Sequence, residues 1–293
     1  MNRKAFLQVL GPLPPKVGLR ARLLEQVDCG SYVREKVEYT TEPGERVRAY
    51  LLLPKAAQRL PAVFCHHQHA SNWDLGKSEV VGLAGDPDQA YAKELAERGF
   101  VTFAPDAIAF EERKLDKDGR WGNYCALTTR LVRGTTLLGK VLHDISVGID
   151  YLQSRRETDP ARIGFLGHSY GGRMAIWAAA FDKRIIAAVS HCGCVNYKDS
   201  FDPTTGIQME FVAPGVLKKG DIEDVVRLIE PNKLLLSATT RDKYSKGARK
   251  IYNYARPAFK KGTLKLQLYP GNHVFTPTMR THAYRFLEQH LAK

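Results

Sequence analysis

Short apolar runs alternate with helical segments along most of this 293-residue chain. Two strand-like stretches come first, at 33–40 and 46–53, on either side of the turn sequence Thr41-Glu42-Pro43-Gly44. Strand and helix patterns then alternate from residue 61 to the C-terminal end. Because βαβ units place parallel strands side by side beneath helices, this order predicts an α/β fold. We expect a mostly parallel central sheet with an N-terminal antiparallel hairpin and helices on both faces.

Apolar runs and helical periodicity locate the individual elements. The expected strands after the hairpin are 61–65, 100–104, 162–166, 185–190, 234–237 and 264–269. The expected helices are 88–98, 137–154, 169–181, 245–256 and 277–291. We expect residues 1–30 to form an N-terminal arm or helix packed on a single domain, 31–293. Within that domain, a loop excursion at about 107–136 is expected over the active face.

Composition narrows the class of protein. With 44% hydrophobic and 26% charged residues, the chain is an ordinary globular one, and disordered and coiled-coil classes are excluded. No run of about 18 apolar residues is present, so we expect no membrane span. The cysteines are few and lack a C-x-x-C spacing, and the N-terminal residues do not match a signal peptide. Both observations favour a cytoplasmic location. The cysteines are Cys29, Cys65, Cys125, Cys192 and Cys194.

The most informative stretch runs from Arg162 to Gly172. It contains Gly167-x-Ser169-x-Gly171 between an apolar strand and an apolar helix. A serine on such a turn has a strained backbone and an exposed hydroxyl above the sheet. The helix N-terminus adds free N–H groups that favour a developing anion. We therefore predict that Ser169 is a nucleophile.

A serine hydroxyl needs a base, and the base needs an orienting acid. In folds of this type the chain order is serine, acid, histidine. His273 lies in the loop after the last expected strand and is the predicted base. Residues 231–293 contain only two carboxylates, Asp242 and Glu288, and only Asp242 precedes His273. Asp242 is the predicted acid, with Glu230 or Asp202 from earlier loops as the alternative.

The oxyanion hole requires two N–H donors. The backbone of Tyr170, directly after the nucleophile, is one expected donor. The loop His66-His67-Gln68-His69 follows the first parallel strand, and the backbone N–H of Gln68 is the other. If this segment is extended, His66 and His67 face opposite sides and cannot bind one metal ion together, and no carboxylate follows these histidines before Asp74. We therefore predict no metal site.

With these residues in hand, the chain resembles the α/β-hydrolase superfamily in its dienelactone-hydrolase-like and acetyl-xylan-esterase-like branch. The likeness runs from about Glu35 to Leu291. It is carried by His66–His69 with Leu75-Gly76-Lys77-Ser78, Ala104-Pro105-Asp106, Asp159–Gly164, the turn around Ser169, and Gly271-x-His273-x-Phe275. The resemblance implies a serine esterase with a Ser-Asp-His triad and no cofactor. Two departures are Ser169 where true dienelactone hydrolases use cysteine, and Gln68 where many relatives have glycine.

The expected activity is hydrolysis of a small or soluble carboxylic ester through an acyl-enzyme intermediate. A peptidase or amidase of the prolyl-oligopeptidase-like branch is the alternative, and a non-catalytic binding protein is a further one. The residues that could line the substrate pocket are His67, Phe110, Trp121, Tyr124, Tyr170 and Phe211. The expected partner is a small-molecule ester, without nucleic acid or membrane, and the N-terminal arm could reach a second copy in a homo-oligomer.

The net charge of +13 is concentrated at one end of the chain. Residues 231–293 contain 13 basic and two acidic side chains, a difference of +11. No nucleic-acid-binding motif accompanies this charge. We interpret it as a solvated basic face, with an anionic substrate or surface as the alternative.

Overall fold

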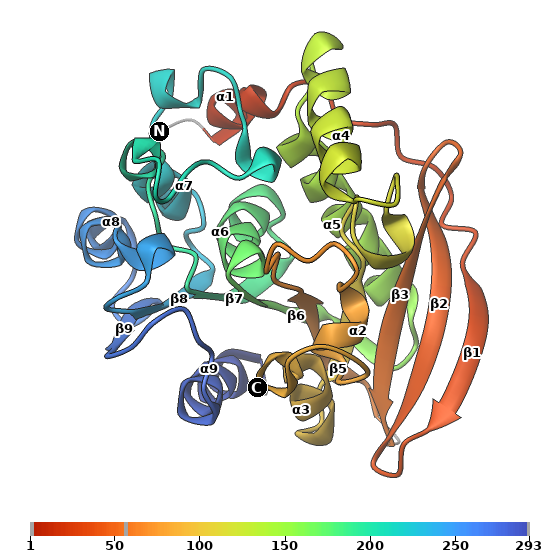
Figure 1. The fold of residues 1–293 in the computed structure, drawn as a ribbon. Coiled ribbons are helices and arrows are strands. Elements are labelled where there is room, and N and C mark those ends of the chain that lie inside the picture. Colours follow the sequence, from red (N-terminus) through yellow and green to blue (C-terminus); the bar gives the residue numbers. More distant parts are fainter. Residues whose placement is uncertain (1–2, 56–57, 292–293) are drawn as a thin grey trace.

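A computed structural model describes residues 3–55 and 58–291 and contains one nine-stranded sheet. Its strand order is β1-β2-β3-β5-β4-β6-β7-β8-β9 (Figure 1). Strands β1 to β3 pair antiparallel, β3 pairs antiparallel with β5, and all later pairings are parallel. The strands are β1 Arg22–Asp28, β2 Tyr32–Glu42, β3 Glu45–Pro54, β4 Leu60–His66, β5 Val101–Pro105, β6 Thr158–His168, β7 Ile185–His191, β8 Lys233–Thr239 and β9 Leu264–Tyr269. The predicted α/β-hydrolase architecture is confirmed.

Helices cover both faces of this sheet (Figure 1). Helices α3 and α9 pack on one face, and α5, α6 and α8 on the other. The helices are α1 Arg3–Leu7, α2 Lys77–Val80, α3 Tyr91–Glu97, α4 Arg120–Val132, α5 Leu137–Ser154, α6 Tyr170–Phe181, α7 Ile222–Arg227, α8 Ala248–Ala255 and α9 Pro277–Leu291. Among the described residues, no helix is both long and apolar enough to cross a bilayer.

The core is divided by the sheet into two apolar layers. Under α5 and α6, the ring of Phe64 stacks on Phe165 at 5.0 Å and meets Phe103 edge-on at 5.7 Å. Under α3 and α9, residues such as Leu166 and Val189 pack against the opposite helices. Both faces of the central strands are therefore buried, which explains why these strands read as continuous apolar runs rather than alternating ones.

Two elements differ from the expectation. The stretch expected as an N-terminal arm contains β1, which pairs with β2 at the edge of the sheet. Its side chains are almost all exposed, including Leu23 and Leu24, so no alternation of buried and exposed positions marked it in the sequence. The 107–136 excursion is not all loop, because it contains the 13-residue helix α4.

Helix α4 was not expected from the sequence because its inward face is only partly apolar. Gly122 and Asn123 are buried beside Ala126 and Leu127, whereas Trp121, Tyr124 and Val132 are exposed. Two expected helices also begin later than predicted, α3 at Tyr91 and α8 at Ala248, since short 3-10 turns at Pro87–Gln89 and Lys243–Ser245 precede them. Sequence periodicity does not separate such turns from the helices that follow them.

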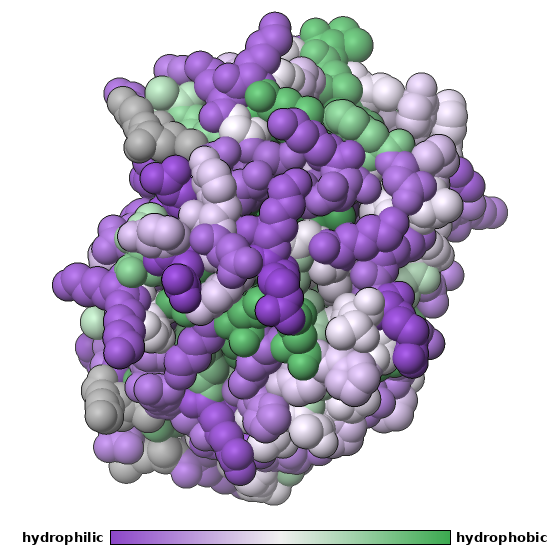
Figure 2. Space-filling view, turned by 90° about the vertical axis from the view of Figure 1, so that its left-hand side faces the viewer, coloured by the Kyte–Doolittle hydropathy of each residue, from purple (hydrophilic) through white to green (hydrophobic). Residues whose placement is uncertain are grey.

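Most basic side chains of the C-terminal segment 231–293 are exposed to solvent. The side of the structure that includes α7, α8 and β9 is largely hydrophilic, with small apolar areas between polar ones (Figure 2). Nine basic side chains of this segment are exposed: Arg241, Lys243, Lys246, Arg249, Lys250, Arg256, Lys260, Lys261 and Arg285. A solvated basic face is therefore what the structure shows for this part of the charge.

We predict that Phe64→Ala lowers the free energy of unfolding by about 3–5 kcal/mol, because it removes a fully buried ring that contacts two others. Urea titration followed by circular dichroism measures this change. Val132→Ala is the matched control, since Val132 is 89% exposed and should change stability by less than about 0.5 kcal/mol. Equal losses in both variants would contradict the assignment of Phe64 to the core.

Candidate active site

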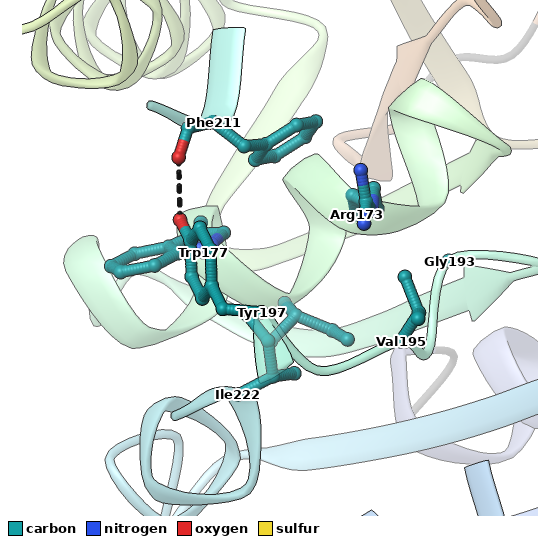
Figure 3. A pocket seen from close by; sticks show the side chains of 8 residues that line it. Arg173, Trp177, Gly193, Val195, Tyr197, Phe211 and Ile222 are labelled. Atoms are coloured by element: carbon teal, nitrogen blue, oxygen red, sulfur yellow. Dashed lines mark hydrogen bonds between the residues drawn. The ribbon is translucent and has the colours of Figure 1, made fainter. Parts of the chain in front are cut away.

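Ser169 occupies a strained turn between β6 and α6. Its φ is +58° and its ψ is −113°, a conformation that a non-glycine residue adopts only at a cost. Its backbone N–H donates to the carbonyl of His191 at 2.9 Å, and its own carbonyl accepts from the N–H of Arg173. Figure 3 shows the Arg173 side chain, one turn along α6, beside the ring of Phe211. The turn is therefore held from both β7 and the helix it opens.

The glycines around Ser169 allow close backbone contacts. A Cβ atom on Gly171 would overlap the carbonyl of His66, and one on Gly172 would overlap the carbonyl of His191. A Cβ atom on Gly167 would overlap the backbone of Gly171 itself. Strand β6, helix α6 and the ends of β4 and β7 therefore meet at distances that exclude any side chain. The G-x-S-x-G pattern is required here by packing, as the sequence predicted.

The predicted base and acid are hydrogen-bonded to each other. Nδ1 of His273 lies 2.9 Å from Oδ1 of Asp242, which is 4% exposed. The hydroxyl of Ser245 donates to Oδ2 of Asp242 at 2.6 Å, and the N–H of Tyr244 donates to Oδ1 at 3.0 Å. Burial alone would raise the pKa of Asp242, but the bonds from His273, Ser245 and Tyr244 hold that pKa below its usual value. Asp242 is therefore an anion that fixes the orientation of His273.

The alternative acids lie elsewhere. Asp202 is paired with Lys246 at 2.9 Å on the surface, and the backbone carbonyl of Glu230 accepts from Lys183 at 2.9 Å. Neither carboxylate bonds to His273 within the described part of the chain. Asp242 is the acid that the structure joins to the candidate base.

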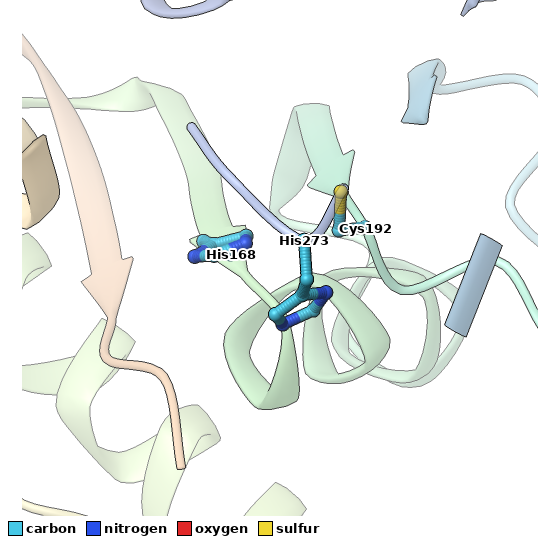
Figure 4. Close-up of side chains that lie close together, drawn as sticks. All are labelled: His168, Cys192 and His273. Atoms are coloured by element: carbon cyan, nitrogen blue, oxygen red, sulfur yellow. The ribbon is translucent and has the colours of Figure 1, made fainter. Parts of the chain in front are cut away.

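The imidazole of His273 lies against the residue that precedes Ser169. Its ring centroid is 4.7 Å from that of His168, and Figure 4 shows both rings beside the thiol of Cys192. One ligating atom from each of these three side chains falls within 4.8 Å of the others. In the described residues the Ser169 hydroxyl donates no hydrogen bond, so the structure joins His273 to Asp242 but not to Ser169. Because Asp242 occupies Nδ1, the other ring nitrogen of His273 is left for a substrate or a hydroxyl.

A second histidine, His191, braces the loop that carries His273. Its Nδ1 lies 2.7 Å from the hydroxyl of Ser237 on β8, and its Nε2 lies 2.7 Å from the carbonyl of Val274. A carbonyl can only accept, so Nε2 carries a proton, and burial lowers the pKa of the ring to about 4, so Nδ1 carries none and accepts from the Ser237 hydroxyl. Sequence order excluded His191 as the base but could not reveal this bracing role, because its partners are 46 and 83 residues away.

The loop after β4 is positioned by His67. Its Nδ1 lies 2.7 Å from the carbonyl of Gln68, and its Nε2 accepts from the N–H of Ala107 at 3.1 Å. Nδ1 therefore carries the proton. The N–H groups of Gln68 and Tyr170 donate to no other group of the described chain, so both predicted oxyanion donors are free. His67 is 1% exposed with both nitrogens engaged, so in the structure it positions the loop, and its contact with substrate stays a prediction.

Lys77, a buried lysine at the start of α2, forms ion pairs with three carboxylates of the segment that follows β5. Nζ of Lys77 lies 2.7 Å from Asp106, 2.5 Å from Glu111 and 2.6 Å from Glu112. The three carboxylates alone have the spacing of a cation site, but the ammonium group of Lys77 lies within ion-pair distance of all three. The segment after β5 is thereby tied to the start of α2.

The predicted pocket residues separate into two groups. Phe110 and Phe211 are buried, and both contact the Tyr170 ring, at centroid distances of 5.8 and 5.7 Å. Trp121 and Tyr124 are 61% and 47% exposed and stack on each other at 5.2 Å on the surface of α4. Phe110, Tyr170 and Phe211 thus form an apolar cluster that includes the residue after the candidate nucleophile, and in the described part of the chain no ring contact joins it to the exposed pair.

Residues 47–285, most of the chain, match the family model described as the dienelactone hydrolase family. The chain belongs to the dienelactone hydrolase family. YtaP of Bacillus subtilis (strain 168), which is named as a hydrolase, is 30% identical over 198 residues. That alignment covers 67% of this chain and 64% of YtaP, so the chain spans less than two thirds of this relative.

Solved structures of esterases share the fold. A glucuronoyl esterase from Solibacter usitatus aligns with a TM-score of 0.74 at 16% identity, covering 98% of this chain and 91% of that one. An acetyl xylan esterase from Paenibacillus sp. R4 aligns with a TM-score of 0.68 at 18% identity, covering 99% and 92%. At such identities the likeness establishes the architecture of this dienelactone hydrolase family member and nothing finer.

We predict that Gly171→Ala abolishes activity and lowers the free energy of unfolding by about 1–3 kcal/mol, because the added methyl group would overlap the carbonyl of His66. Ester hydrolysis together with thermal unfolding tests this. Gly18→Ala is the control, since a Cβ atom there meets nothing within 4 Å. A Gly171→Ala variant with unchanged melting temperature and activity would contradict the packing described for the turn.

We also predict that the protein loses stability in mild acid. Burial lowers the pKa of His66 to about 3, of His67 to about 4 and of His191 to about 4, and lowers that of His168 far below its usual value. In the unfolded chain, each of these histidines has a pKa of about 6.5. Stability is therefore fully present above that value and falls with decreasing pH, by about 1.4 kcal/mol per pH unit for each histidine.

Urea unfolding at several values between about pH 7 and pH 5 measures this slope. Added salt should leave the slope in place, because loss of hydration rather than long-range repulsion keeps these rings neutral. The buried Asp106, whose pKa is raised to about 7, contributes a slope of opposite sign over this interval and offsets about one of the four histidines. A free energy of unfolding that stays constant between about pH 7 and pH 5 would contradict the prediction.

Proposed function

We propose that the protein is a serine hydrolase that cleaves carboxylic ester bonds. The observation that carries the proposal is the position of Ser169 in a strained turn at the start of α6, with a bonded Asp242–His273 pair on neighbouring loops. A nucleophile at a helix N-terminus, a base and an acid that orients the base make up the parts of a catalytic triad. Membership of a hydrolase family supports the assignment.

In the proposed reaction, Oγ of Ser169 attacks the ester carbonyl carbon while Nε2 of His273 takes its proton. Asp242, bonded to Nδ1, stabilises the imidazolium that forms. The carbonyl C–O bond to the alcohol breaks, and the alcohol leaves with the proton from His273. Water then attacks the acyl-enzyme with His273 again as base, which releases the acid and restores Ser169.

The negative charge that develops on the carbonyl oxygen requires donors that are already in place. The free N–H groups of Tyr170 and Gln68 fill this role in the proposal. His67 supports Gln68 through the backbone, so the second donor is held without the glycine that many relatives have at this position. Removal of one such donor typically costs about 10²–10³-fold in rate.

We propose a small or soluble ester as the substrate. The predicted pocket rings Phe110 and Phe211 are buried and packed against Tyr170, the residue after the nucleophile. Structural neighbours named as acetyl xylan and glucuronoyl esterases favour esters carried on polar molecules. A comparison of acetate esters with long-chain esters and aminoacyl amides separates this proposal from a lipase and from a peptidase.

We predict that Ser169→Ala, His273→Ala and Asp242→Asn each lower kcat for 4-nitrophenyl acetate by about 10³-fold or more, since each removes a member of one catalytic unit. Ser31→Ala is the matched control, because Ser31 is exposed and should keep full activity. A fluorophosphonate probe should label the wild-type protein and the control but not Ser169→Ala. Full activity in Ser169→Ala would overturn the mechanism, and an unlabelled, inactive wild type would favour a non-catalytic binding protein.

A further inference from the structure

Three side chains that are far apart in the sequence bring metal-binding atoms together beside the candidate nucleophile. His168 ends β6, Cys192 follows β7, and His273 lies in the loop after β9 (Figure 4). One ligating atom from each of them lies within 4.8 Å of the other two. The other group with such a spacing among the described residues, the three carboxylates around Lys77, already holds an ammonium group. The group of two imidazoles and a thiol contains no cation of its own.

His168 has an unused lone pair in this group. Its Nδ1 donates to Oε1 of Gln89 at 3.0 Å, since an amide oxygen can only accept. The residue is 1% exposed, and within the described chain its Nε2 has no hydrogen-bond partner. Burial lowers the pKa of this ring far below its usual value, so Nε2 carries no proton. A buried acceptor without a donor is costly, and a bound metal ion would use its lone pair.

Cys192 supplies a thiol from a strained turn. Its φ is +50°, a region that a non-glycine residue adopts only at a cost, and its N–H donates to the carbonyl of Ser237 on β8 at 2.9 Å. Burial raises the pKa of the thiol to about 12, so without a metal ion the sulfur stays protonated. Formation of a metal–sulfur bond would release this proton to solvent, because the thiolate is the form that ligates.

His273 gives the group its access to solvent. Its side chain is 31% exposed, whereas His168 and Cys192 are buried. Both of its ring nitrogens serve the proposed reaction, because Nδ1 bonds Asp242 and Nε2 is the proposed base. A metal ion bound to either nitrogen would therefore stop the transfer of the proton from Ser169.

We propose that His168, Cys192 and His273 form a Zn²⁺ site that switches off the esterase when the ion binds. Two imidazoles and a thiolate suit Zn²⁺, whereas Mg²⁺ and Ca²⁺ take oxygen ligands. Tetrahedral zinc accepts three protein ligands and one water molecule. Zn–N bonds of about 2.0–2.1 Å and a Zn–S bond of about 2.3 Å bring the ligand atoms to about 3.3–3.6 Å from one another, so His273 must move by roughly 1 Å. The inference rests on the proposed esterase function, but the binding of the ion can be measured without it.

The bond from Gln89 to His168 matches what metal sites require. A ligating histidine usually donates its other ring N–H to a fixed acceptor, which orients the ring. We expect Gln89→Ala to weaken zinc binding by about 10- to 100-fold, because it removes the group that orients His168.

Co²⁺, a coloured substitute for Zn²⁺, tests the binding directly. Titration of the wild type should produce thiolate-to-cobalt charge-transfer absorption, and added Zn²⁺ should abolish it. Cys192→Ser should lack this absorption and bind Zn²⁺ at least about 100-fold more weakly, since loss of a ligand costs more than loss of its outer partner. Cys194→Ser is the matched control, because Cys194 is an equally buried thiol outside the group and its removal should leave the absorption in place. If Cys192→Ser does not fold, the absorption of the wild type still decides whether a thiolate binds the ion.

Inhibition is measured with 4-nitrophenyl acetate. At ten times its dissociation constant, Zn²⁺ should lower the wild-type rate about tenfold, and a chelator should restore the rate. Rates with and without Zn²⁺ are compared within each variant, so a change in the basal rate does not affect the result. At the same Zn²⁺ concentration the two rates should be nearly equal in Cys192→Ser, and Mg²⁺ should inhibit neither protein.

A wild type without charge-transfer absorption, or equal zinc affinity in the wild type and Cys192→Ser, would overturn the site and leave the esterase intact. Absorption together with an unchanged rate would overturn the proposed inhibition. A protein that binds Zn²⁺ as expected but hydrolyses no ester would instead overturn the proposed function.

Discussion

The close approach of four backbone segments around Ser169 determines the rest of the site. The carbonyls of His66 and His191 lie where side chains of Gly171 and Gly172 would otherwise be. This contact fixes the ends of β4 and β7 against the first turn of α6, and it forces Ser169 to a φ of +58°. The free N–H of Tyr170 and the nearby loop that carries Gln68 then follow from the same packing. The close packing at Gly171 and Gly172 thus sets the positions of the candidate nucleophile and both candidate oxyanion donors.

The base is held by a different means. His273 lies on a loop after β9, far along the chain, and the N–H of Arg241 donates to the carbonyl of Gly271 in that loop at 2.9 Å. Two further polar contacts hold it: Asp242 hydrogen-bonds Nδ1 of His273, and His191 hydrogen-bonds both Ser237 on β8 and the carbonyl of Val274. Such contacts depend on neutral buried imidazole and ionised aspartate, so the geometry of the base is tied to pH in a way that the geometry of the nucleophile is not.

Sequence reasoning succeeded where local chemistry leaves few choices. A glycine-flanked serine between strand and helix has one common structural meaning, and the scarcity of carboxylates in the last 63 residues singled out Asp242. The sequence does not show which way a side chain faces. His67 and His191 hydrogen-bond to backbone and hydroxyl groups of distant elements, and Trp121 is exposed whereas Phe110 is buried. Strand β1 was missed because its side chains are almost all exposed, and helix α4 because Gly122 and Asn123 interrupt a short apolar face.

The treatment of buried charge divides the molecule into a scaffold and a site. Lys77, Arg113, Lys140 and Arg280 join distant segments, and each is surrounded by carboxylates, so their charges are balanced within the protein. Arg173 departs from this rule, because its guanidinium donates to the neutral side chains of Gln208 and Ser200 and lies over the rings of Phe211 and Tyr244. Among the described residues no carboxylate lies within ion-pair distance of it, and burial lowers its pKa. Hydrogen bonds to neutral groups and contacts with aromatic faces therefore hold this cation one turn after the candidate nucleophile.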